Sequence, residues 1–207
     1  CLAESRGNSA PGDLKESLTI GPIDVPDEPY YHCAEAGQHF VENRWPERPA
    51  DLKQIWSDYW RAMERLAADM MRLFALALDL NEHYFDKLMD KHVSQFRVLN
   101  YPDQPETPLE DQFRASAHSD FGACTICSIE DKPGGLQAMN RNGAWVDVPV
   151  VVDGFCINLG DQMQMWTNDK WVSTLHRVVN PPRIKAIGSR RQSMIFFFYT
   201  NYDSVIE

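Results

Sequence analysis

The stretch "SAHSDFGAC", residues 116 to 124, places an imidazole and a carboxylate two residues apart, at His118 and Asp120. The neighbouring residues are typical of a β-strand, in which side chains two apart point to the same face. The two groups therefore converge on one point, and this arrangement suits a metal ion. The tripeptide alone is weak evidence, because a strand histidine beside an acidic residue is often only a hydrogen-bonded pair.

A third metal ligand must come from elsewhere in the chain. Among the remaining histidines, His176 lies in a strand-like run, "STLHRVV", whereas His32, His39, His83 and His92 lie in segments that we expect to be an arm or helices. The interval from Asp120 to His176 is long enough for the chain to leave through several strands and return across a β-sandwich. We therefore expect His118, Asp120 and His176 to hold a metal ion.

Two imidazoles and one carboxylate would leave about three positions of an octahedral divalent ion open. This ligand set is typical of non-haem Fe(II) oxygenases. A catalytic zinc site with two histidines and one acidic ligand is the chemical alternative, while a closed structural zinc site would need a fourth protein ligand.

The last apolar run, "RQSMIFFFYTN", adds independent evidence for an anion site. Arg191, Ser193 and Phe197 share one face of the predicted strand, and both faces are largely apolar. A buried arginine is costly without an anionic partner. Arg191 and Ser193 could offer a planar fork and a hydroxyl to a carboxylate. The alternative is an internal salt bridge with one of the 30 acidic residues.

The first half of the chain should support this site rather than form it. Residues 1–50 are rich in Pro, Gly and acidic residues without sustained periodicity, so we expect an ordered arm or connector that carries none of the chemistry. From Asp51 the apolar residues fall at steps of three and four, which predicts a long amphipathic helix, and Asp51 with Gln54 resembles a capping box. A second helix is predicted near "NEHYFDKLMDKH", so that residues 51–92 brace the core.

Residues 93–207 have the character of a β-domain. Short β-rich runs are divided by Gly, Pro, Asn and Asp turns: "SQFRVLNYP", "ACTICSIE", "GGLQAMN", "AWVDVPV", "GFCINL", "MQMWT", "STLHRVV" and "SMIFFFYTN". They predict a mostly β fold with helices, a double-sheet jelly roll or small barrel. The five cysteines are an odd number with irregular spacing, so we expect no disulfide framework, and we interpret Cys124 and Cys127 as buried thiols.

Composition limits the partners. The formal net charge of −10 argues against nucleic acid, because binding to a phosphate backbone relies on clustered Lys and Arg. No apolar run approaches the roughly 20 residues that span a bilayer, and the N-terminus does not resemble a signal peptide. We expect a cytoplasmic protein without membrane association, a monomer that acts on a small molecule. Cys1 in place of a start methionine indicates a piece of a longer sequence.

The motifs together resemble a known family. "HSD" (118–120), "STLHRVVNP" (173–181) and "RQS" (191–193), in that order and in this β context, resemble the 2-oxoglutarate and Fe(II)-dependent dioxygenases of the isopenicillin N synthase-like superfamily. Supporting similarities are "RVLNYP" (97–102), "GGLQ" (134–137), "WVDVP" (145–149), "NLGDQMQMWTN" (158–168) and "NYDSVIE" (201–207). The resemblance implies a double-stranded β-helix, a cupin-like jelly roll braced by a long N-terminal helix. Members usually extend further at both ends.

The resemblance also implies roles for residues. His118, Asp120 and His176 would be the iron ligands, and Arg191 and Ser193 would bind the distal carboxylate of 2-oxoglutarate. Tyr101 of "NYP" would add a hydrogen bond to the same co-substrate. Some relatives carry an asparagine two residues before this tyrosine, where this chain has Leu99. Some relatives stack substrate on the position of Phe197, although a core phenylalanine is the alternative.

The implied activity is a non-haem Fe(II) and 2-oxoglutarate-dependent oxygenase. With dioxygen, it would hydroxylate, desaturate or cyclise a small organic metabolite, of the kind found in secondary metabolism, and release succinate and CO2. An isopenicillin N synthase-like Fe(II) oxidase without 2-oxoglutarate is the nearest alternative, since that enzyme uses its own Arg-x-Ser pair on a substrate carboxylate. A non-catalytic binding module on the same fold and a zinc hydrolase are further alternatives.

Overall fold

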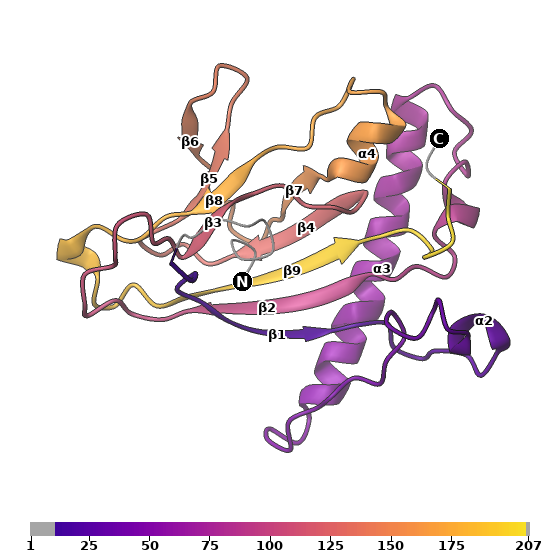
Figure 1. The fold of residues 1–207 in the computed structure, drawn as a ribbon, viewed down its shortest axis with the longest axis horizontal. Helices are drawn as coiled ribbons and strands as arrows, with labels where there is room; N and C mark the ends of the chain where they lie inside the picture. The colour runs from indigo at the N-terminus through magenta and orange to yellow at the C-terminus, as the bar shows by residue number, and fades with distance from the viewer. Residues whose placement is uncertain (1–10, 206–207) are drawn as a thin grey trace.

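The computed structural model describes residues 11–205, and its core is a pair of antiparallel sheets (Figure 1). The larger sheet has the order β1-β2-β9-β4-β7, formed by Glu16–Ile20, Gln95–Tyr101, Arg191–Phe198, Cys124–Ile129 and Cys156–Leu159. The smaller sheet has the order β3-β8-β5-β6, formed by Ala115–His118, His176–Val178, Leu136–Met139 and Trp145–Asp147. The mostly β, double-stranded β-helix prediction is confirmed.

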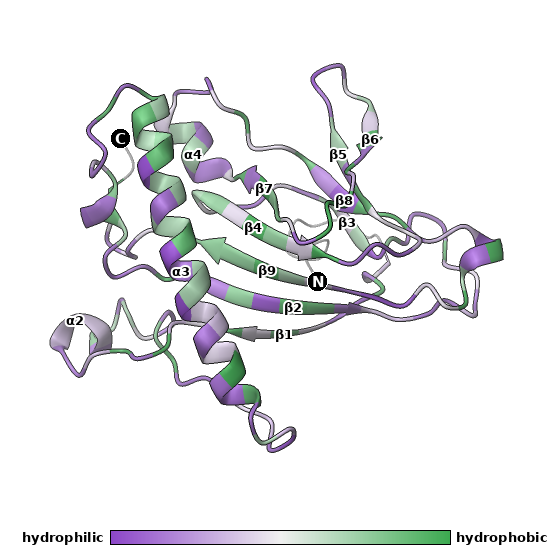
Figure 2. Ribbon diagram, turned by 180° about the vertical axis from the view of Figure 1, so that it is seen from behind, coloured by the Kyte–Doolittle hydropathy of each residue, from purple (hydrophilic) through white to green (hydrophobic). Residues whose placement is uncertain are grey.

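The long predicted helix is α3, Leu52–Ala77, which crosses one face of the larger sheet (Figures 1 and 2). Its buried residues recur at helical spacing, and among them Trp60 packs edge-on against Phe196 of β9 with ring centroids 5.1 Å apart. A second apolar cluster, which includes Leu99, Tyr101 and Val178, lies between the two sheets. The helix therefore covers one face of the larger sheet and leaves the other face to the smaller sheet.

The predicted capping box at the start of α3 is wrong. Asp51 is the N-cap residue, but its backbone is helical (φ −90°, ψ −3°) and its side chain caps no backbone amide. An aspartate usually caps from extended backbone, which brings its carboxylate over the first free amides of the helix. Gln54 instead donates a hydrogen bond to Asp58, one turn further along the helix.

The second predicted helix is also wrong. Within residues 81–92 the structure contains turns and one short 3-10 helix, Asp86–Leu88. Asn81 accepts a hydrogen bond from the backbone amide of His83, and the His83 ring contacts Asp86. Such local side-chain bonds compete with a continuing helix.

The run "MQMWT" is a helix and not the predicted strand. Residues Asp161–Trp166 form α4, which follows β7. Met163 is fully buried while Met165 is 62% exposed, and Trp166 packs against Phe85 with ring centroids 5.0 Å apart. Met163 and Trp166 are three residues apart and meet the core from one face of a helical turn. A strand would have pointed Met163 and Met165 to the same face.

The N-terminal arm joins the larger sheet at its edge. Strand β1 pairs antiparallel with β2, with Thr19 opposite Arg97. Beyond it in the chain lie the short helix α2, Pro29–His32, and the connection to α3. In the second half of the chain, a 3-10 helix, Arg183–Lys185, precedes β9. The limits 1–50, 51–92 and 93–207 stay a prediction, and residues 1–10, with Cys1, lie outside the described residues.

Two further features concern cysteines and surface. Cys124 and Cys127 are buried free thiols, as expected, and burial raises the pKa of both to about 12.

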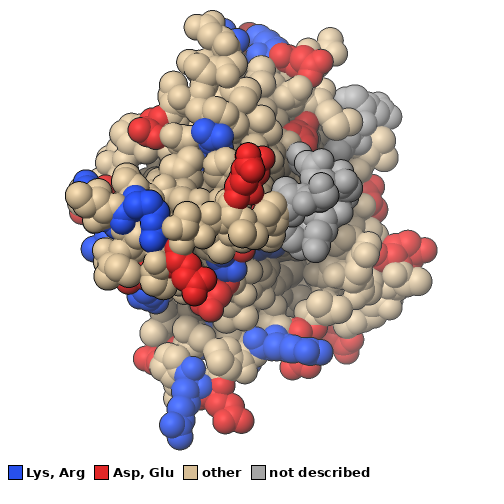
Figure 3. All heavy atoms as spheres, turned by 60° about the vertical axis from the view of Figure 1, so that its left-hand side comes forward, with Lys and Arg blue, Asp and Glu red and all other residues tan. Residues whose placement is uncertain are grey.

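Figure 3 shows Lys and Arg side chains interspersed with acidic ones on the face that it presents. In the part of the chain that the structure describes, no helix combines the length and apolar character needed to cross a membrane.

Candidate metal centre

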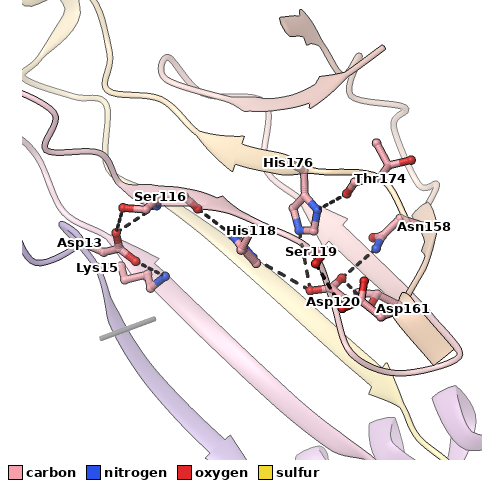
Figure 4. Close-up of polar contacts among 11 residues, drawn as sticks. Asp13, Lys15, Ser116, His118, Ser119, Asp120, Asn158, Asp161, Thr174 and His176 are labelled. Atoms are coloured by element: carbon pink, nitrogen blue, oxygen red, sulfur yellow. Dashed lines mark hydrogen bonds and ion pairs between the residues drawn. The ribbon is translucent and has the colours of Figure 1, made fainter. Parts of the chain in front are cut away.

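The three predicted metal ligands meet where β3 and β8 lie side by side. His118 ends β3 and is the register partner of His176, the first residue of β8. The Nε2 atoms of His118 and His176 lie 4.0 and 3.8 Å from Asp120 Oδ1 (Figure 4). One ligand atom from each residue lies within 4.8 Å of the others, which is close enough for one ion to contact all three.

The path of the chain differs from the prediction at Asp120. Strand β3 ends at His118, so Asp120 lies in the following loop and does not share a strand face with the histidine. The pairing of β3 with β8 is also irregular between Ala115 and His118, as in a β-bulge. Bulges re-aim side chains beside functional sites. The convergence that we expected is present, but a bulge and a loop produce it.

Backbone carbonyls orient both imidazoles. His118 Nδ1 lies 2.7 Å from the carbonyl oxygen of Ser116, and His176 Nδ1 lies 2.9 Å from that of Thr174 (Figure 4). Because a carbonyl only accepts, each Nδ1 carries the proton and each Nε2 presents its lone pair to the centre. Burial, reinforced by His176, lowers the pKa of His118 and favours the neutral form that binds metal ions.

Asp120 is held by two polar side chains that the sequence analysis did not assign. Its Oδ2 accepts hydrogen bonds from Thr125 Oγ1 and Asn158 Nδ2, both at 2.7 Å. Thr125 and Asn158 are register partners on β4 and β7. The arrangement leaves Oδ1 of Asp120 facing the histidines. A signal was present in the sequence, because each of these polar residues interrupts an apolar strand run, "CTIC" and "CINL".

Arg191 lies in the same cavity and lacks an anionic partner among residues 11–205. It is 1% exposed, its Nε and Nη1 are buried without a hydrogen-bond partner, and Nη2 lies 3.4 Å from Ser193 Oγ. Its guanidinium lies 5.2 Å from the centre of the Tyr101 ring. The internal salt bridge considered above is therefore not formed in this part of the chain. A buried cation with free donors fits an anionic ligand such as a carboxylate.

One cavity of about 380 Å³ between the sheets contains both features. Its lining includes every predicted site residue: His118, Asp120, His176, Arg191, Ser193, Tyr101 and Phe197. Leu99 also lines the cavity and offers an apolar side chain where some relatives have an amide. Lys15 reaches the cavity from the arm, while the expectation that the arm carries none of the chemistry stays a prediction.

The comparison with known proteins decides the family. A family model described as the 2OG-Fe(II) oxygenase superfamily matches residues 93–200, which is half of the chain. This chain belongs to the 2OG-Fe(II) oxygenase superfamily. The residues that make up the two sheets, except for β1, lie within the match.

Individual relatives of this superfamily member cover most of the chain. The 2-oxoglutarate-Fe(II) type oxidoreductase hxnY of Emericella nidulans is 36% identical over 198 residues, which are 93% of this chain and 54% of that protein. A homoarginine-6-hydroxylase of Arabidopsis thaliana is 30% identical over 168 residues, 80% of this chain and 49% of the relative. The chain therefore spans about half the length of these two relatives.

Solved structures agree with the fold. The crystal structure of a full-length Neurospora crassa protein in complex with alpha-KG has a TM-score of 0.81 and 31% identity, and the match covers 96% of this chain and 59% of that one. The superfamily uses Fe(II), 2-oxoglutarate and dioxygen. The donor atoms around Asp120 suit the metal, and the free donors of Arg191 suit the co-substrate. The relatives thus favour 2-oxoglutarate dependence over the oxidase alternative.

Proposed function

We propose that this 2OG-Fe(II) oxygenase superfamily member is an oxygenase that couples oxidation of a small organic molecule to conversion of 2-oxoglutarate into succinate and CO2. One observation carries the proposal. The His118, Asp120 and His176 donors share one cavity with Arg191, whose buried Nε and Nη1 have no partner in the described residues. In this proposal the first three residues hold Fe(II), and Arg191, Ser193 and Tyr101 hold the far carboxylate of 2-oxoglutarate.

The bound metal and co-substrate would supply activation of dioxygen and oxidation of a substrate carbon. The chain's own residues prepare the site for that chemistry. Thr125 and Asn158 occupy Oδ2 of Asp120, so the carboxylate offers one oxygen to the metal. Three protein donors leave the other positions of an octahedral ion for exogenous ligands. Leu99, Ile195 and Phe197 give the cavity apolar walls.

The size of the cavity supports a small substrate. A volume of about 380 Å³ must hold 2-oxoglutarate as well as the molecule that is oxidised. Among related proteins, the Neurospora crassa structures include complexes with thymine and 5-formyluracil, and the Arabidopsis thaliana relative is a homoarginine-6-hydroxylase. Hydroxylation, desaturation and ring closure are all compatible with the site. Stacking of substrate on Phe197, the monomeric state and the cytoplasmic location stay predictions.

A visible absorption titration without oxygen tests the proposal. Fe(II) is added first and 2-oxoglutarate second, and a charge-transfer band should appear only after the second addition. Arg191→Gln should bind Fe(II) normally but require much more 2-oxoglutarate for the same band. Arg65→Gln, on the exposed face of α3, is the matched control.

Other outcomes point to specific alternatives. Iron binding without a band at saturating 2-oxoglutarate would favour the oxidase. Absence of iron binding by the folded wild-type protein would refute the proposed ligand set.

If the band appears as expected, succinate release in the presence of oxygen would identify substrates among candidate metabolites.

A further inference from the structure

A second arginine, Arg97 of β2, lines the cavity at a distance from Arg191. Its Nε donates a 2.9 Å hydrogen bond to Thr19 Oγ1, and its Nη2 lies 3.5 Å from Gln95 Oε1. Among residues 11–205 it forms no ion pair with a carboxylate. The neutral partners fix the guanidinium without neutralising its charge, and the Nη1 donors have no protein acceptor in the described residues.

The strand register separates the two arginines. On β2 and β9, Tyr101 is opposite Arg191, whereas Arg97 is opposite Ile195. The guanidinium of Arg191 lies over the Tyr101 ring, and that of Arg97 lies over the Phe197 ring, each at 5.2 Å. Arg97 and Tyr101 are four residue steps apart on β2, a backbone distance of about 13 Å. The cavity therefore has two cationic positions, one at the Tyr101–Arg191 end of the β2–β9 pair and one further along it at Arg97.

Tyr199 connects the Arg97 end with the metal centre. Its ring stacks on Phe197 with centroids 6.4 Å apart, and both rings line the cavity. The pKa of Tyr199 is raised to about 12, mainly by burial and also by the charge of Asp120, while the charge of Arg97 acts in the opposite direction. A Cβ added at Gly122, two residues after Asp120, would lie 3.0 Å from Tyr199 Cδ1, so the Tyr199 ring borders the loop that carries the Asp120 carboxylate.

The charges of the cavity do not balance without another anion. The charged residues in its described lining are Lys15, Arg97, Arg191 and Asp120. Two positive charges of Fe(II) offset two negative charges of 2-oxoglutarate, and Asp120 offsets Arg191. Lys15 is paired with Asp13 at 2.7 Å. One positive charge therefore remains, at Arg97, and a partly buried charge without a counter-ion is unfavourable.

We propose that the substrate of this site is an organic acid whose single carboxylate binds Arg97, with its apolar part against Phe197. The proposal rests on the proposed function and names the substrate class for the same cavity. A guanidinium fork matches a carboxylate in bidentate fashion. A dianionic phosphate ester would bring one more negative charge than Arg97 can offset. Arg97 is thus a residue that determines specificity, and it is separate from the residues that hold the metal and co-substrate.

The test uses protein loaded with Fe(II) and 2-oxoglutarate without oxygen. Matched pairs are added: phenylacetate with phenylacetamide, cinnamate with cinnamamide, and phenyl phosphate as the phosphate probe. Dissociation constants come from ligand-observed NMR, and 2-oxoglutarate affinity from the absorption band.

Acids should bind better than their amides. Arg97→Gln should weaken acid binding by about tenfold or more, because a charge-assisted hydrogen-bond pair is lost. Binding of the amides and of 2-oxoglutarate should stay unchanged in Arg97→Gln. Arg97→Lys should restore part of the preference for acids. The control Arg65→Gln should bind all probes as the wild type does.

Several results would overturn the proposal. The proposal fails if the acids bind no better than their amides or do not bind at all. It also fails if the protein prefers phenyl phosphate, or if Arg97→Gln binds the acids as tightly as the wild type does. A parallel loss of acid, amide and 2-oxoglutarate binding in that variant would show a damaged cavity, and would overturn the specific role of Arg97. Binding of Fe(II) and 2-oxoglutarate to the wild-type protein is measured before any acid is added. If neither binds, the proposed function itself fails.

Discussion

Asp120 supplies the negative charge of the proposed metal centre, and its two oxygens have different environments. Oδ2 accepts hydrogen bonds from Thr125 and Asn158, while Oδ1 faces the two histidines. The residue is 6% exposed, and burial of an unpaired carboxylate would be costly. The two hydrogen bonds fix the orientation of the carboxylate before any metal binds. The position is therefore prepared for a cation.

The first prediction concerns removal of this carboxylate. Asp120→Ala should lose stoichiometric Fe(II) binding, because two neutral imidazoles remain without the anionic ligand. Equilibrium dialysis against Fe(II) under nitrogen measures the effect. Asp161→Asn, at the first residue of α4, is the control and should retain the metal. Full metal stoichiometry in Asp120→Ala would show that the ligand set is wrong.

The second prediction concerns the partners of Asp120. Asn158→Ala and Thr125→Val should each lower metal affinity by about tenfold or more, the range found when outer hydrogen bonds to metal ligands are removed. Co(II) is the probe, because its visible spectrum also reports ligand geometry. The spectrum should change in both variants and stay unchanged in Asn142→Ala, which alters an exposed turn. Weakened folding with an unaltered Co(II) spectrum would contradict the positioning role.

At the scale of elements, the start of α4 holds the loop that carries Asp120. The backbone amide of Asp161 donates to the carbonyl of Asp120 at 2.7 Å, and that of Gly160 donates to Ala123 at 3.2 Å. Gly160 lies at the N-cap of α4, and a Cβ there would collide with the backbone oxygen of Gly122. The close approach of the two backbones requires glycine at this position.

The third prediction follows from this contact. Gly160→Ala should lower the free energy of unfolding by about 1–3 kcal/mol, because two backbone segments must separate to admit the methyl group. The same variant should also weaken metal binding, since the moved segment carries Asp120. Urea denaturation and Co(II) titration measure the two effects. Gly135→Ala is the control, since an added Cβ meets nothing within 4 Å there. Equal stability of the two variants would contradict the close contact.

At the scale of the whole molecule, the N-terminal arm is part of the site. Asp13 Oδ1 accepts hydrogen bonds from the Ser116 amide and hydroxyl, at 2.9 and 2.6 Å, and Ser116 in turn orients His118 (Figure 4). Asp13 also pairs with Lys15, whose side chain lines the cavity. The arm therefore links the edge of the larger sheet to a proposed metal ligand in the smaller sheet.

The fourth prediction concerns acid stability. Burial raises the pKa of Asp13, but hydrogen bonds from Lys15 and Ser116 outweigh this effect and leave the pKa below its ordinary value of 3.8. The net pKa shifts of Asp86 and Asp103 are also downward. The folded state thus binds fewer protons than the unfolded state. Its extra stability is present above about pH 4 and is lost as the pH falls through the folded pKa values.

Urea denaturation between pH 6 and pH 3 measures this dependence. The free energy of unfolding should fall as the pH is lowered, and Asp13→Asn should show a smaller fall than wild type. Asp131→Asn, at an exposed position, should keep the wild-type slope. An unchanged slope in Asp13→Asn would show that its carboxylate does not gain protection on folding.

Which elements could be predicted depended on how local their causes were. Helix α3 was predictable because its apolar residues repeat at helical spacing over 26 residues. Segment Asp161–Trp166 was not, because its apolar residues alternate in sequence while the core contacts only Met163 and Trp166. The 3-10 helix Asp86–Leu88 replaced a predicted α-helix for a different reason, because side-chain hydrogen bonds at Asn81 and His83, which apolar spacing does not reveal, interrupt the helix.

The sequence by itself determined the residue types of the site. Two histidines, a carboxylate and the Arg-x-Ser pair are chemically distinctive, and their order and β context indicated the family. The tertiary structure alone decided which side chains support them. Thr125, Asn158, Asp13 and Arg97 come from four separate segments. Thr125 and Asn158 stand out in the sequence as polar residues in apolar runs, but only the fold shows that both contact Asp120. Hydrogen bonds and charge interactions act over a few ångströms in space, and only the folding of both sheets and the arm brings these groups within that range.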